Sequence, residues 1–305
     1  MKSFKYLLTG LLAITLCGRL SAQNSDDARA LIKEGQKLNN EKKYTEAIEK
    51  YRQALKIDTG NLFADYQLAN SLFLSDKGPE GVPYLNKITQ SDSKLTGAAY
   101  DLLGFIYFKN KQYGEAEAAA VAAIKLDPKH ASTQRMYALV SFHQNKRAQA
   151  LLGFCSFILL EANTARSVEA YDNMQHIMQG GNLKPEPGEM TSHAIEANVN
   201  ALNQAITRAV ADFSKRRYAS TGDLLNAGLT AMFTNIGKLA ENQTGNDFFR
   251  NYFAAYFYKL AQSPNMPAFA RLVSSSTPES AKWIKEHPQQ MADLDSWVKA
   301  TERGF

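Results

Sequence analysis

The stretch GAAYDLLGFIYFKNKQYGEAEAAAVAAIKLDPKH, residues Gly97–His130, decides the fold of this chain. It contains two largely apolar segments separated by a polar turn. Gly104 lies in the first segment, and Ala116 follows twelve residues later in the second. Small side chains at these places let two antiparallel helices approach closely, because larger ones would hold the backbones apart. The stretch therefore predicts a tight helix–turn–helix unit.

The same stretch resembles a tetratricopeptide repeat, a helix–turn–helix unit of about 34 residues. Tyr100, Leu103, Gly104 and Tyr107 take the spacing W-x2-L-G-x2-Y, with Tyr in place of Trp, and Pro128 closes the unit. Such repeats bury their apolar faces only by stacking on copies of themselves. The resemblance therefore implies further repeats on either side.

A first repeat is expected at about residues 28–61, because four residue pairs recur at one offset of 69 residues, about two repeat lengths. The pairs are Gly35/Gly104, Tyr44/Tyr113, Ala47/Ala116 and Ala54/Ala123. A degenerate second repeat fills the gap, and we expect Gly78, Pro79, Gly81 and Pro83 to disturb its turn and the start of its second helix. A looser fourth repeat follows near Ala131. The sequence thus predicts a solenoid of about four repeats over residues 28–162.

The rest of the chain is expected to be helical but not repetitive. A capping helix is predicted over residues 163–179, with Ser167 as its N-cap, and the segment GGNLKPEPG at 180–188 is typical of a linker. Residues 189–305 are predicted to form a separate helical domain, since their apolar residues recur at alternating spacings of three and four. The predicted fold class is all-α, a solenoid followed by a C-terminal helical bundle.

Details within this bundle are also predicted. Its aromatic run FFRNYFAAYFYKL, which begins at Phe248, is expected to form core, because aromatic residues at helical spacing usually pack inside. Short helices are expected at 267–273, 278–286 and 288–301, the last two with a proline in the first turn.

The first 22 residues have the layout of a secretory signal peptide. Lys2 and Lys5 precede an apolar run that ends at Cys17, and small residues lead to a predicted cleavage after Ala22. The run is shorter than the roughly 20 apolar residues that a membrane-spanning helix requires. We therefore expect export, to the periplasm, with retention as an N-terminal membrane anchor as the alternative. Lipidation of Cys17 is disfavoured, because Leu16 departs from the lipobox pattern.

Charge and motifs exclude several classes of protein. The chain carries 35 basic and 30 acidic residues, and removal of the leader leaves 32 against 30, so no basic stripe indicates nucleic-acid binding. The sequence contains no phosphate-binding loop, nucleophile elbow or zinc-protease motif, so no enzyme activity, cofactor or metal is expected. Glu189, His193 and Glu196 share a predicted helix face, but such residues are more often solvated than metal-bound. Cys155 lies in an apolar run and is expected to be a small core residue.

Candidate binding residues follow from the resemblance, because the first helix of each tetratricopeptide repeat lines the concave groove. They are Phe63, Tyr66, Asn70, Phe73, Asp101, Phe105, Phe108, Arg135, Leu139 and Phe142. Such an aromatic groove fits an apolar helix or an extended peptide. Occupation of the groove by a partner and occupation by the C-terminal helices remain alternatives at this point.

The sequence thus favours an exported scaffold or adaptor that binds a protein or peptide partner through this groove. Two alternatives stay open. One is a helical hydrolase or lyase with its site in the C-terminal bundle and the repeats as a docking arm, and the other is a structural subunit of an envelope complex. The sequence leaves the oligomeric state open.

Overall fold

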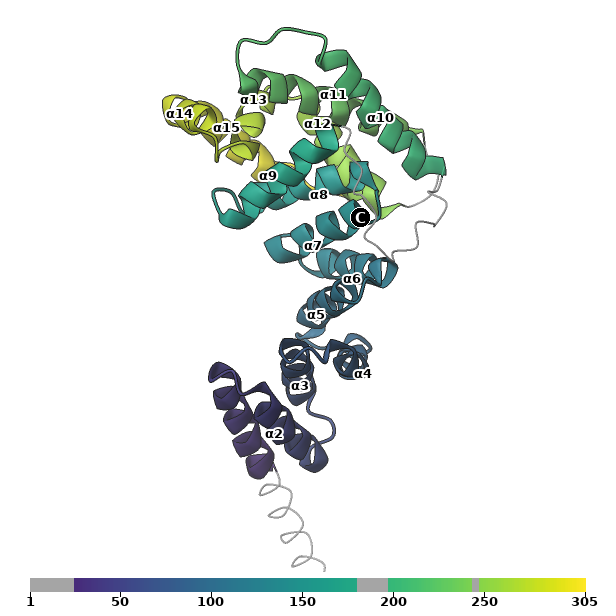
Figure 1. The fold of residues 1–305 in the computed structure, drawn as a ribbon, viewed down its shortest axis with the longest axis vertical. Helices are drawn as coiled ribbons and strands as arrows, with labels where there is room; N and C mark the ends of the chain where they lie inside the picture. The colour runs from purple at the N-terminus through teal and green to yellow at the C-terminus, as the bar shows by residue number, and fades with distance from the viewer. Residues whose placement is uncertain (1–24, 180–196, 243–246) are drawn as a thin grey trace, which may run out of the picture. The chain divides into compact units, whose positions relative to one another are not determined.

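The computed structural model describes residues 25–179, 197–242 and 247–305 (Figure 1). Every regular element in these ranges is helical, and they contain no β-strand. The predicted all-α class is therefore confirmed for these residues. The predicted signal peptide at 1–22 and linker at 180–188 lie outside them.

None of the helices within these three ranges combines the length and the apolar character that crossing a bilayer requires.

The chain divides into two compact units, with the division between Lys111 and Gln112. The first unit contains a helix over residues 25–40 and then α2 (Tyr44–Ile57), α3 (Leu62–Leu74), α4 (Gly78–Thr89) and α5 (Thr96–Lys109). The second unit contains α6 (Tyr113–Leu126), α7 (Ala131–His143), α8 (Arg147–Leu160), α9 (Ala165–Met178), α10 (Ala197–Phe213), α11 (Thr221–Glu241), the π-helix η1 (Phe249–Ala254), α12 (Ala255–Ala261), α13 (Met266–Val273), α14 (Pro278–Glu286) and α15 (Pro288–Ala300).

Small residues lie where helices of the first unit cross, as expected for stacked repeats. A Cβ on Gly35 would lie 2.7 Å from the ring of Tyr51, and a Cβ on Gly81 would lie 3.1 Å from the backbone of Ala69. Consecutive helices α2 to α5 pack on one another in order. One core cluster lies between the helix over residues 25–40, α2 and α3, and it consists of Ile32, Ala47, Ile48, Tyr51, Ala54, Ala64, Leu68 and Leu72.

A recurring turn joins the two helices of each repeat. Lys42, Asp76, Lys111 and Asn145 have positive φ angles of 60°, 63°, 59° and 55°. They are separated by 34, 35 and 34 residues, and each lies two residues before the next helix begins. The N–H that follows donates to a carbonyl five residues back, as in a Schellman motif: Lys43 to Leu38 at 2.8 Å, Lys77 to Leu72 at 2.8 Å and Lys146 to Ser141 at 2.9 Å. The degenerate second and fourth repeats therefore keep the turn of the first.

The expected disturbance of the second repeat does not occur. Helix α4 runs without interruption through Pro79 and Pro83. Pro79 lies in the first turn, where its missing N–H would have no helical partner in any case. Pro83 lies inside the helix, where its missing N–H removes one hydrogen bond to the carbonyl of Pro79 without interrupting α4. Helix α4 therefore tolerates both prolines near its N-terminal end.

Helix α8 is the centre of the second unit. All residues from Arg147 to Ile158 are buried, and α8 contacts α7, α9, α10, η1 and α13 (Figure 1). A helix that is apolar all round must be enclosed on every side. The described helices of region 189–305 thus pack on the fourth repeat and belong to its compact unit. The ends of the solenoid at residue 162, of the capping helix at 179 and of the linker at 188 stay predictions.

Two helices of the second unit begin where the sequence predicts, and a third begins earlier than predicted. Helices α14 and α15 begin at Pro278 and Pro288, as predicted. Helix α9 begins at Ala165 rather than after Ser167, because Thr164 is the N-cap. The Thr164 hydroxyl accepts the Ser167 N–H at 3.2 Å, and the Ser167 hydroxyl accepts the Thr164 N–H at 2.8 Å. Ser167 therefore completes a capping box at the third helical position.

The aromatic run that begins at Phe248 forms core, as predicted. Phe249, Tyr252, Phe253, Tyr256 and Phe257 are all buried. The ring of Phe253 stacks on that of Tyr137 in α7 at a centroid distance of 4.8 Å. The run thus fastens η1 and α12 to the fourth repeat.

Candidate functional site

Seven of the predicted binding residues lie in the first unit, and we call them the aromatic strip. In α3, Leu68, Ala69 and Leu72 are fully buried, so the opposite positions are left at the surface. The side chain of Phe63 is 38% exposed, and the other six are partly buried. The strip comprises Phe63, Tyr66, Asn70 and Phe73 from α3, and Asp101, Phe105 and Phe108 from α5.

Contacts between α3 and α5 hold the strip together. The Phe73 and Phe105 rings lie 6.5 Å apart at an angle of 42°, and the Lys109 ammonium lies 5.6 Å from the centre of the Phe73 ring. Lys109 also pairs with Asp76. Burial raises the pKa of the Tyr66 hydroxyl, and the negative charge of Asp101 adds to that rise. The strip therefore combines aromatic faces with charges at its edge.

The three predicted residues on α7 are engaged within the second unit. Arg135 donates to a Glu169 carboxylate oxygen at 2.6 Å. Phe142 is only 8% exposed, and its ring meets those of His176 and Phe154 at 6.0 and 6.1 Å. Leu139 is partly buried. Helix α9 thus supplies packing partners for the face of α7 that was predicted to bind.

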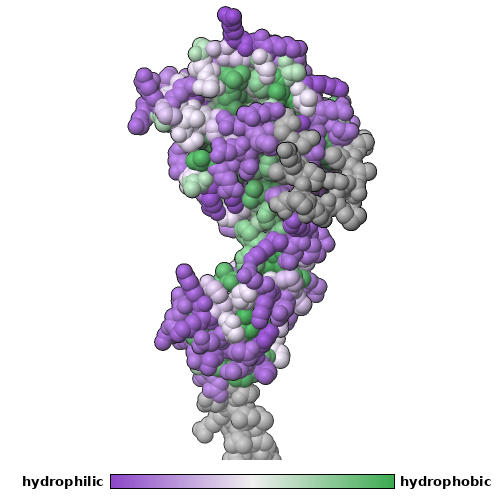
Figure 2. Space-filling model, in the orientation of Figure 1, coloured by the Kyte–Doolittle hydropathy of each residue, from purple (hydrophilic) through white to green (hydrophobic). Residues whose placement is uncertain are grey.

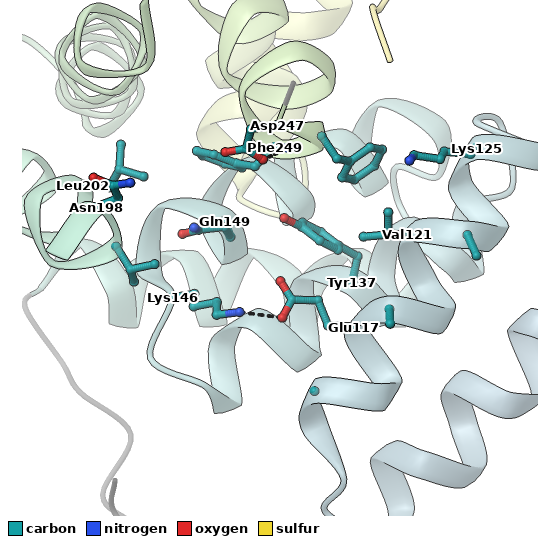
Figure 3. Close-up of a pocket in the computed structure, with 15 residues that line it drawn as sticks. Glu117, Val121, Lys125, Tyr137, Lys146, Gln149, Asn198, Leu202, Asp247 and Phe249 are labelled. Carbon is teal, nitrogen blue, oxygen red and sulfur yellow. Dashed lines mark hydrogen bonds and ion pairs between the residues drawn. The ribbon is translucent and has the colours of Figure 1, made fainter. Parts of the chain in front are cut away.

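A pocket of about 600 Å³ lies elsewhere in the second unit, and the sequence did not predict it (Figure 3). Helices α6, α7, α8 and α10 and the start of η1 form its walls. It is lined by Gly114, Glu117, Ala118, Val121, Ala122, Lys125, Tyr137, Lys146, Gln149, Asn198, Val199, Leu202, Asp247, Phe248 and Phe249. One signal was available, since Gln149 is one of three polar residues, with Arg147 and Ser156, in a mainly apolar α8.

Charges at this pocket are matched by neighbours. Lys146 pairs with Glu117 at 2.5 Å, as Figure 3 shows, and Gln144 donates to the same carboxylate oxygen at 2.9 Å. Asp247 accepts the Phe249 N–H at 2.9 Å. Burial raises the pKa of the Tyr137 hydroxyl well above its ordinary value, which keeps the phenol neutral. These contacts favour binding of an uncharged group over acid–base chemistry.

The described part of the chain contains neither a group of metal-binding side chains nor a reactive thiol. Its His, Cys, Asp and Glu residues form no group of three or more that suits a metal ion. The Glu189, His193 and Glu196 set lies outside the described residues. Cys155 is fully buried, and burial raises the pKa of its thiol well above the ordinary value. A thiol in this state is a poor nucleophile.

Comparisons with known proteins agree with the repeat interpretation. Residues 97–130 match the family model described as "Tetratricopeptide repeat". Helix pairs pack consecutively in the manner of such a solenoid, as α3 does with α4 and α7 with α8. The third repeat is therefore confirmed by sequence, and the surrounding helical packing is of the same kind.

No curated protein matches the chain. A solved structure whose title reads "Functional Characterization of Pseudomonas Aeruginosa pilF" is similar, with a TM-score of 0.45 and 16% identity. The alignment covers 90% of this chain and 99% of that chain.

Proposed function

We propose that this protein is an exported scaffold or adaptor that binds a protein or peptide partner through the aromatic strip. Repeat solenoids present extended surfaces of this kind to partners. The observation that carries the proposal is the set of partly exposed rings, among them Phe73 and Phe105, held between α3 and α5. Aromatic residues dominate the binding energy of protein interfaces, because they bury a large area at small entropic cost.

The strip suits a peptide because it is already formed. Helix α3 packs on the first-unit core and α5 packs on α4 and α3, so few groups need to be ordered when a partner binds. Lys109 and Asp76 place charges at one edge, where they can fix the orientation of the partner. We assign Arg135 and Phe142 to packing, since Glu169, His176 and Phe154 already engage them.

The test is crosslinked capture from intact cells, followed by affinity measurement with the purified partner. We expect Phe73→Ala with Phe105→Ala to weaken binding by about tenfold or more, as for residues at the centre of an interface. Leu74→Ala is the matched control, because Leu74 is 44% exposed and lies next to Phe73 in α3. Equal affinity for the wild type and the double variant would refute the assignment to the strip.

We further propose that the chain is exported to the periplasm by cleavage of residues 1–22. The basic and apolar layout of this leader supports the proposal. Mass spectrometry of the protein from a periplasmic fraction is expected to find a chain that begins at Gln23. A full-length chain in the membrane fraction would instead support an N-terminal anchor.

A further inference from the structure

The pocket in the second unit contains a buried acceptor without a donor. Gln149 in α8 is 7% exposed, and among the described residues its side-chain oxygen Oε1 has no hydrogen-bond partner. Figure 3 shows its amide among the lining residues, between Tyr137 and Leu202. A buried carbonyl oxygen without a donor destabilises a folded protein, so its presence at a pocket indicates a missing donor.

A second buried glutamine has hydrogen-bond partners within the protein for its whole amide. Gln134 in α7 is fully buried, and its amide nitrogen donates to the Pro128 carbonyl at 3.0 Å and to the Tyr252 hydroxyl at 2.7 Å. Its amide oxygen accepts from the Ser156 hydroxyl at 3.0 Å. The unit thus satisfies Gln134 completely with its own groups. Gln149 differs because it lines a pocket and its buried oxygen has no donor among the described residues.

The remaining lining defines the chemistry of an occupant. Val121, Ala122, Val199, Leu202 and Phe249 supply apolar walls. The formal charges of the lining cancel, because Lys125 and Lys146 are matched in number by Glu117 and Asp247. Lys146 pairs with Glu117, Lys125 lies 5.8 Å from the centre of the Phe248 ring, and Asp247 accepts a backbone N–H. The pocket therefore fits an uncharged, apolar group that carries an N–H donor.

We propose that this pocket binds a short apolar peptide segment of a partner protein, with one N–H of the peptide donating to Gln149 Oε1. A peptide combines apolar side chains with N–H donors, which is the pattern that the lining requires. The volume of about 600 Å³ accommodates more than one side chain. Ala118 and Asn198 at the rim are exposed, so a chain can enter and leave. The site belongs to the second unit and does not depend on the aromatic strip.

Selection from a displayed library of uncharged seven-residue peptides tests this proposal, with the full mature chain as bait. We expect recovered peptides to share a large apolar residue. Ala118→Trp fills the rim at an exposed position, and it should reduce the affinity of a selected synthetic peptide by about tenfold or more. Peptides that bind wild type and Ala118→Trp equally, or a selection that recovers none, would overturn the proposal.

Two glutamine variants separate binding from folding. Gln149→Leu is expected to weaken the selected peptide by about threefold to tenfold, the effect of one lost hydrogen bond, without lowering the melting temperature. Gln134→Leu should lower the melting temperature clearly, because it leaves several buried groups unpaired. A Gln149→Leu chain with undiminished affinity would refute the proposed bond. A melting temperature lowered as much as that of Gln134→Leu would show that the chain itself uses the acceptor, which would also refute it.

Discussion

The first helices of the repeats carry equivalent positions in both units, but their surroundings differ. In the first unit, the rings of Phe73 and Phe105 contact each other and remain partly exposed. In the second unit, Phe142 is enclosed by His176 of α9 and Phe154 of α8. A repeat position is thus a potential binding residue or a core residue according to which helices pack upon it. Figure 2 shows the surface that results, mainly hydrophilic with smaller apolar areas.

The largest effect that separates the two regions should come from paired phenylalanine truncations. Phe142→Ala is expected to cost about 3 to 5 kcal/mol of the free energy of unfolding, because it opens a cavity in a packed core. Phe105→Ala should cost about 1 kcal/mol, since its ring is already partly solvated. Urea unfolding followed by far-ultraviolet circular dichroism measures both. Similar losses would erase the distinction between the regions.

Acid should act on the second unit through Glu279. This carboxylate accepts hydrogen bonds from the Thr221 hydroxyl and from Arg271, and these lower its pKa from 4.5 to about 2. Its folded pKa lies below its unfolded value, so the stability it contributes is present above about pH 4.5 and is lost as pH falls toward 2. The pKa of Asp65 in the first unit is shifted in the opposite direction, because burial raises it.

Tryptophan fluorescence can isolate this effect, because Trp283 and Trp297 are the two tryptophans and both lie in the second unit. We expect Glu279→Gln to flatten the dependence of second-unit stability on pH between about 4.5 and 2, the range set by the two pKa values. Glu286→Gln is the control, since Glu286 in the same helix α14 pairs with the exposed Lys282. An unchanged profile for Glu279→Gln would contradict this role.

The smallest expected effect compares the turns of the two units. Lys42 and Asn145 both adopt a positive φ. Such a conformation costs a non-glycine residue about 1 kcal/mol, whereas Asn tolerates it better. We therefore expect Lys42→Gly to raise the free energy of unfolding by about 0.5 to 1 kcal/mol and Asn145→Gly to change it little. Thermal unfolding measures both, and an equal gain would show that the side-chain difference is unimportant.

Several features of the fold were predictable because they depend on neighbours in sequence. The repeat period, the small residues at helix crossings and the prolines that begin α14 and α15 are local signals. The predicted N-cap of α9 was misplaced by three residues, since Thr164 and Ser167 are both good capping residues. The resemblance indicated the positions of the aromatic strip, and its role in binding stays a prediction.

The pocket and the enclosure of α8 were not predictable in this way. Gln134 and Tyr252 are hydrogen-bonded across 118 residues of sequence, and the pocket draws on α6, α7, α8, α10 and η1 together. Nothing in the local pattern distinguishes Gln149, whose oxygen has no partner in the described residues, from the fully bonded Gln134.

Residue order alone was enough to establish a helical repeat protein, because helix periodicity, caps and close helix crossings act over one or two turns. Which helix face is covered, and therefore which side chains remain available for binding, was decided by tertiary packing. Apolar burial is non-directional, so an apolar face can pack against several alternative neighbours. The choice among these neighbours depends on all the helices of the second unit at once.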